Sequence, residues 1–95
     1  MATNKDYFLF VLDLLRKIPG ISYKKMMGEY ILYKDGIIFG GIYDNRFLVK
    51  KTAYSSGLGL KEQIPYPTGK PMLLIDSEDT DVIKELVLNI VKDLR

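Results

Sequence analysis

The residues of this sequence best suited to chemistry are carboxylates in one short run near the C-terminus. The run contains Asp76, Glu78, Asp79 and Asp81, and calcium and magnesium prefer carboxylate oxygens as ligands. It lacks the glycine and the distal bidentate glutamate of a calcium-binding loop. Because a helical pattern follows directly, the acids also suit the positive end of a helix dipole. We therefore expect the run to cap a helix and predict no metal site.

Two other stretches could serve catalysis or phosphate binding. Ser55-Ser56 could act as a nucleophile only beside a general base, and the chain contains neither histidine nor cysteine. Gly40-Gly41 could let a phosphate approach the backbone, but such loops normally join a strand to a helix, and here another strand follows. We favour a bulge at this pair that gives clearance to a packed helix. The prediction is a protein without enzymatic activity, with no catalytic residue and no cofactor.

Composition is typical of one small globular domain. The chain has 95 residues, a hydrophobic fraction of 47% and a net charge of +2, with a mean hydropathy of +0.01. These values argue against disorder, and we expect a single domain over residues 1–95. The N-terminal apolar run is interrupted by charges, so no signal peptide or membrane span is expected. We predict a cytoplasmic protein that does not contact membranes.

Apolar spacing predicts a helix at each end of the chain. Residues 4–18 follow helical periodicity after a cap at Thr3 or Asn4, and Pro19-Gly20 ends the pattern. A final helix begins after Asp79 or Thr80. Its apolar stripe contains Ile83, Leu86, Val87, Ile90, Val91 and Leu94.

Between the helices the period changes to two, which is typical of strands. Residues 30–33, 37–43 and 46–50 read as strands, joined by two-residue turns at Asp35-Gly36 and Asp44-Asn45. Residues 22–27 form an expected edge strand before a bend at Gly28, and residues 72–75 one more strand. Residues 52–58 read as a helical turn, and residues 64–71 as a proline-rich loop. The predicted fold class is α+β, an antiparallel β-meander with the N-terminal and C-terminal helices packed on one face.

Two-residue turns fix which side chains share a face of the sheet. The first face carries no charge and is expected beneath the helices: Ile31, Tyr33, Ile38, Gly40, Ile42, Phe47 and Val49. A bulge at Gly40-Gly41 would shift this register and exchange the faces. The second face mixes aromatic, aliphatic and basic residues, and we predict that it binds a partner through Tyr30, Leu32, Lys34, Phe39, Tyr43, Arg46, Leu48 and Lys50.

Three uses of this second face stay open. Protein–protein contact, including a homodimer, is favoured because the apolar set is large for an exposed surface. Interleaved aromatic and basic residues are also typical of sheets that bind single-stranded nucleic acid. The chain's own loops could also cover the face. With a net charge of +2, nucleic-acid binding is expected to be weak or absent, and tight sequence-specific binding to duplex DNA is not expected.

The run from Tyr23 to Lys51 resembles the N-terminal domain of the TfoX/Sxy family. The similarity extends over nearly the whole chain, with residues 25–28, Tyr30, 32–33, 35–36, 39–41, 43–44 and 48–50 as its matching features. The resemblance implies a single TfoX N-terminal-like domain whose motif is structural. The motif residues are Gly28, Asp35, Gly36, Gly40 and Gly41.

This resemblance also implies a function. Longer members of the family look like co-activators of competence genes that work with the cAMP receptor protein, and they carry a second, helical C-terminal domain. The present sequence ends at Arg95, so we expect a stand-alone N-terminal domain. The implied role is regulation, in competence or in transcription, by contact with a protein partner such as the transcription machinery.

Overall fold

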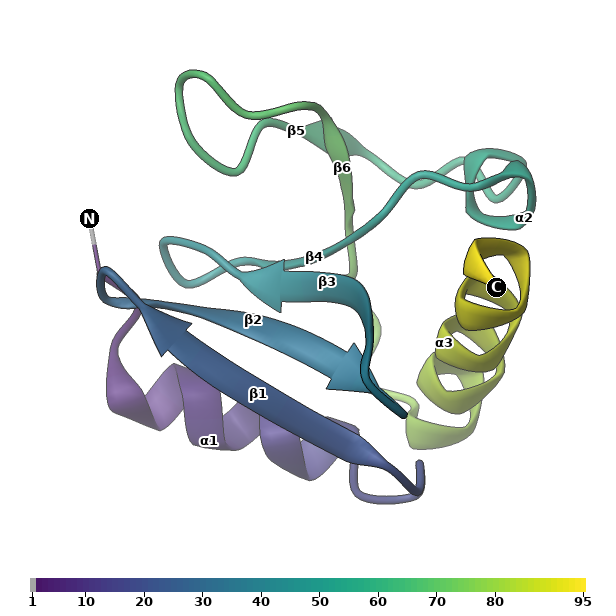
Figure 1. The fold of residues 1–95 in the computed structure, drawn as a ribbon, viewed down its shortest axis with the longest axis horizontal. Coiled ribbons are helices and arrows are strands. Elements are labelled where there is room, and N and C mark those ends of the chain that lie inside the picture. Colours follow the sequence, from purple (N-terminus) through teal and green to yellow (C-terminus); the bar gives the residue numbers. More distant parts are fainter. Residues whose placement is uncertain (1) are drawn as a thin grey trace.

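The computed structural model describes residues 2–95, which form an α+β fold of one sheet and two long helices (Figure 1). The elements run, in chain order, α1 (Lys5–Leu14), β1 (Ile21–Met26), β2 (Glu29–Lys34), β3 (Ile37–Ile42), β4 (Phe47–Val49), α2 (Ala53–Ser56), β5 (Glu62–Gln63), β6 (Met72–Leu74) and α3 (Thr80–Leu94).

The sheet has six strands in the order β1-β2-β3-β4-β6-β5, and every neighbouring pair is antiparallel. The first four strands form the predicted meander. After α2 the chain returns to the sheet, where β6 pairs with β4 and β5 lies at the outer edge. Strand β5 was not predicted, because its two residues are too few to show a period.

Each turn of the meander has two residues with positive φ, as a tight hairpin requires. The predicted turns at Asp35-Gly36 (φ 51° and 81°) and Asp44-Asn45 (φ 51° and 56°) are confirmed. The expected bend at Gly28 is a third turn of this kind, because Met27 and Gly28 have φ values of 52° and 82°. A methionine rarely adopts this conformation, which is why the sequence indicated only a bend there.

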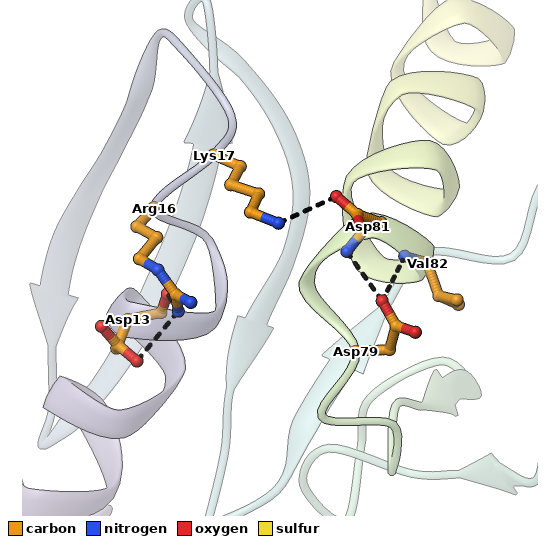
Figure 2. Close-up of polar contacts among 6 residues, drawn as sticks. All are labelled: Asp13, Arg16, Lys17, Asp79, Asp81 and Val82. Carbon is orange, nitrogen blue, oxygen red and sulfur yellow. Dashed lines mark hydrogen bonds and ion pairs between the residues drawn. The ribbon is translucent and has the colours of Figure 1, made fainter.

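Side chains cap both long helices as predicted. The Asn4 carboxamide oxygen accepts from the backbone N–H of Tyr7, and an Asp79 carboxylate oxygen accepts from the N–H groups of Asp81 and Val82 (Figure 2). Capping is therefore confirmed as the role of Asp79. Helix α1 ends at Leu14, earlier than the predicted residue 18, and the chain continues in a turn.

An ion pair links the two helices where the end of α1 approaches the start of α3. Lys17 Nζ lies 3.0 Å from Asp81 Oδ1, and Figure 2 shows the lysine reaching across from the turn after α1. Both side chains are largely exposed, so the pair adds little stability. The helices are held by packing instead.

Both long helices cover the same face of the sheet, as predicted. Phe8, Val11 and Leu14 of α1, together with Leu15 just after the helix, share one buried cluster with the apolar stripe of α3. The Phe8 ring stacks on Tyr30 with 3.8 Å between centroids. The strand residues of this cluster are Tyr30, Leu32, Phe39, Ile42, Phe47, Val49 and Leu73.

The predicted register between β2 and β3 is wrong over half its length, because a bulge adds one residue to β3. Tyr33 pairs with Ile38 as expected, but Leu32 pairs with Gly40, so Phe39 is the extra residue. The bulge exchanges the faces of β2. Tyr30 and Leu32 therefore point to the helices, and Ile31 and Tyr33 to the opposite side. Between β3 and β4 the predicted register is confirmed.

The two glycines of β3 provide clearance, although not for a helix as predicted. A Cβ at Gly40 would overlap the carbonyl oxygen of Leu48 and lie 2.9 Å from Val49 Cα. The close neighbour is thus the backbone of β4. A Cβ at Gly41 would lie 2.6 Å from the Tyr30 carbonyl oxygen and 2.7 Å from the Tyr43 ring. Neither position has room for a larger residue, because the β4 backbone lies against Gly40 and the Tyr30 carbonyl and Tyr43 ring lie against Gly41.

Helix α2 is short and is stabilised by a capping residue before it and by a hydrogen bond to α3. Thr52 and Ser55 form a capping box, and the Asp93 carboxylate of α3 accepts from the Tyr54 N–H at 2.9 Å. This hydrogen bond, together with one from Thr52, lowers the pKa of Asp93. The charged form of Asp93 therefore stabilises the fold.

Asp93→Asn should make stability less dependent on pH in acid. A lowered pKa in the folded state gives stability that is complete above the ordinary aspartate pKa and is lost as the pH falls through the folded value. The variant should be less stable than the parent at neutral pH, and the difference between the two should shrink at an acid pH below the ordinary aspartate pKa, because the lowered pKa of Asp93 is approached there. Urea unfolding at both pH values tests this. Parallel pH profiles would show that Asp93 does not contribute.

Candidate functional site

One face of the sheet is left without a covering helix, and we call it the open face. Its side chains alternate with those of the buried cluster along each strand. They include Lys24, Met26, Ile31, Tyr33, Ile38, Tyr43, Leu48, Lys50, Met72 and Leu74. Figure 1 shows α1 below the sheet and the loop between β5 and β6 rising on the opposite side.

Four of the eight residues predicted to share an exposed partner face lie on the helix-covered side of the sheet instead: Tyr30, Leu32, Lys34 and Phe39. Tyr30, Leu32 and Phe39 are buried beneath the helices, because the bulge at Phe39 turns them inward. The prediction for these three is wrong. Lys34 and Arg46 are committed to other contacts. Tyr43, Leu48 and Lys50 do lie on the open face, although Leu48 is fully buried.

Lys34 is buried at the helix-covered side, with 7% of its surface exposed. Its Nζ lies 2.7 Å from Asp35 Oδ2, and Arg95 approaches the same carboxylate at 3.5 Å. The hydrogen bond from Lys34 lowers the pKa of Asp35. This pair neutralises a buried charge, so Lys34 is a structural residue and not a partner contact.

Arg46 fastens the β5–β6 loop to the turn before β4. Its Nε donates to the Tyr43 carbonyl oxygen at 3.1 Å. One terminal nitrogen donates to Gln63 Oε1 at 2.9 Å and to the Ile64 carbonyl at 3.1 Å, and the other donates to the Pro65 carbonyl at 3.2 Å. A planar guanidinium with several fixed donors suits this arrangement, and a lysine does not. Arg46 thus decides where the loop lies over the open face.

Two hollows on the open face lie beside the fastened loop. The larger hollow, about 760 Å³, is lined by Ile38, Gly40, Tyr43, Lys50, Lys51, Pro65, Tyr66, Thr68, Gly69, Lys70, Pro71 and Met72. The smaller hollow, about 540 Å³, is lined by Ala2, Met26, Met27, Glu29, Ile31, Tyr43 and Tyr66. Tyr43 and Tyr66 line both, with 6.1 Å between their ring centroids. Burial, followed by the neighbouring Tyr66 and Glu29, raises the pKa of Tyr43, so its phenol is neutral at physiological pH.

Glu29 is a carboxylate in the smaller hollow, but its oxygens are already occupied. Oε1 accepts from the N–H and hydroxyl of Thr3 at 2.9 and 2.7 Å, and Oε2 accepts from the Asp44 N–H at 2.9 Å. The residue ties the N-terminus to the turn between β3 and β4. A carboxylate held by three donors is a structural anchor and a poor candidate for proton transfer.

Neither a metal site nor a spanning helix is found in residues 2–95. The aspartate and glutamate side chains of this part form no group of three that could hold a metal ion. None of its helices is long and apolar enough to cross a membrane. What the open face offers is apolar floor, two tyrosines and several lysines, which are groups for binding.

Sequence reasoning missed the contribution of the β5–β6 loop. Tyr66 and Lys70 reach the larger hollow from a segment that we expected only to connect strands. One signal was present: Tyr66 stands between Pro65 and Pro67, and prolines on both sides restrict the backbone around an aromatic residue.

No protein-family model matches the chain. Over 87 residues, the chain is 34% identical to a protein of Spirochaeta aurantia described as an "uncharacterized 12.7 kDa protein in trpE 5'region". The match covers 90% of this chain and 72% of the Spirochaeta protein.

Proposed function

The chain belongs to the family of the uncharacterized 12.7 kDa protein of Spirochaeta aurantia, and from this premise we propose that it is a non-enzymatic interaction module that binds a protein partner through the open face. One observation carries the proposal: the open face and its loop expose apolar side chains beside hollows that a partner can fill. These side chains are Met26, Met27, Ile38, Ile64 and Tyr66.

The exposure of Met27 is the largest of this set. Its side chain is 95% exposed, and its backbone has positive φ. A large apolar residue gains nothing from such a position in a monomer, and strained conformations often mark functional sites. Methionine also adapts its shape readily at binding surfaces. These features support contact with a protein surface.

The first partner that we propose is a second copy of the chain. We extend the proposal to regulation, by contact with a protein such as the transcription machinery, because the sequence resembles the N-terminal domain of the TfoX/Sxy family. The exposed apolar set favours protein contact for the face as a whole, since nucleic-acid interfaces are more polar and more basic.

Ile38→Glu should weaken self-association about tenfold or more, because a symmetric interface would bury the new charge twice. Leu88→Glu is a matched control: Ile38 is 37% exposed on the open face, and Leu88 is 39% exposed on α3. Sedimentation equilibrium over a range of concentrations measures the effect. We expect the parent and the Leu88 variant to gain mass with concentration and the Ile38 variant to remain lighter. A strictly monomeric parent at high concentration would contradict self-association through this face.

A further inference from the structure

We propose that the larger hollow of the open face is a nucleotide-binding site, in which an aromatic base stacks on Tyr66 and a phosphate lies among Lys50, Lys51 and Lys70. The ligand class is a base joined to a phosphorylated sugar, either free or within a single strand. This inference goes beyond the proposed protein contact and does not depend on it.

The charge of the hollow favours an anion. Three lysines line it, and none of its lining residues is acidic. Lys50 and Lys70 form no ion pair with any other residue in the described range 2–95. Lys51 Nζ lies 2.9 Å from Glu62 Oε2, in a pair that is about half exposed and therefore costs little to exchange for a phosphate. The hollow thus gathers positive charge that the fold does not itself neutralise.

Tyr66 provides a flat surface that is exposed and yet fixed. The side chain is 54% exposed, while the carbonyls of Ile64 and Pro65 just before it are held by Arg46. On the other side the Gly69 N–H donates to the Tyr66 carbonyl at 2.8 Å, and a Cβ at Gly69 would lie 3.0 Å from the Tyr66 ring. A ring that is already ordered loses little entropy when a base stacks on it.

The size and floor of the hollow select among anions. About 760 Å³ is within the range of small-molecule sites, and Ile38, Pro71 and Met72 give it an apolar floor. A bare phosphate would leave this floor and the Tyr66 ring unused. An acidic peptide would satisfy the lysines without a flat group for Tyr66. A nucleotide uses both the aromatic and the cationic parts.

The test is a fluorescence-anisotropy titration of the full chain with labelled oligo(dT), with AMP and UMP as unlabelled competitors. We expect weak binding that declines with salt, with a slope in log-log coordinates of about −1.4 to −2.1 for two or three phosphates at roughly 0.7 each. Tyr66→Ala should weaken binding about fivefold to a hundredfold, and Tyr66→Phe should retain it. Lys50→Gln combined with Lys70→Gln should reduce both affinity and slope.

Matched controls come from the opposite face of the sheet. Tyr23 is 51% exposed there, and Lys25 lies near the Tyr30 ring. Tyr23→Ala and Lys25→Gln should leave the titration unchanged, with circular dichroism confirming that every variant is folded.

Each outcome of the titration decides something. Competition by mononucleotides assigns the site to free nucleotides, and binding of the oligonucleotide without such competition assigns it to a strand. The absence of both, or binding that Tyr66→Ala and the lysine pair leave intact, would overturn the proposal. So would a preference for an oligoglutamate peptide of equal charge. Self-association is measured without nucleotide, so either proposal can fail alone.

Discussion

Gly40→Ala should lower the free energy of unfolding by about 3 kcal/mol, at the upper end of the usual cost of overpacking. The added Cβ would overlap the Leu48 carbonyl oxygen and press against Val49 Cα. Both are backbone atoms of β4, which cannot move aside as a flexible side chain would. The substitution must therefore separate β3 from β4 or displace the bulge. Urea unfolding measures the loss.

Gly57→Ala is the control for this prediction. Gly57 has a right-handed helical backbone, and its added Cβ would meet only ordinary contacts at 3.6 and 3.9 Å. Alanine fits such a position and reduces the freedom of the unfolded chain, so a gain of about 0.4–1 kcal/mol is expected. Equal effects at the two glycines would mean that Gly40 tolerates a side chain and that the β3–β4 approach is looser than described.

Arg46→Ala should cost about 2–3 kcal/mol and free the β5–β6 loop. The guanidinium donates four hydrogen bonds, three of them to backbone carbonyls, and hydrogen bonds from charged donors contribute more than neutral ones. No other side chain in the described residues 2–95 donates to the Ile64 and Pro65 carbonyls that precede Tyr66. Hydrogen exchange should therefore accelerate in residues 62–71, while α1 stays protected.

Two further variants separate the role of the several hydrogen-bond donors of the Arg46 guanidinium from that of its charge. Arg46→Lys keeps the charge but cannot reach Tyr43 and Pro65 together, so we expect most of the loss to remain. Lys51→Ala removes only the exposed pair with Glu62 and should cost under about 1 kcal/mol. If Arg46→Lys matched the parent in stability and in hydrogen exchange, the hydrogen bonds of the guanidinium would not be what fastens the loop.

The sequence predicts a site residue when the contacts that position it are made by residues nearby in the chain. Tyr43 and Lys50 were assigned to the binding face and do line the larger hollow. Arg46 was assigned there as well, but it acts by holding a loop 17 to 19 residues further along the chain. No local pattern encodes a contact over that distance. Tyr66 and Lys70 were missed for the same reason.

By itself, the sequence determined the elements whose causes lie within a few residues. Asp35-Gly36 and Asp44-Asn45 form turns because their own backbones accept positive φ, and Asp79 starts α3 because its carboxylate reaches N–H groups two and three residues on. Only the tertiary structure decided which side of β2 is buried. Alternation fixes faces within a strand, but the phase between strands depends on the bulge at Phe39, where β4 approaches Gly40. That bulge turned Tyr30 and Leu32 into the core and left Ile31 and Tyr33 on the open face.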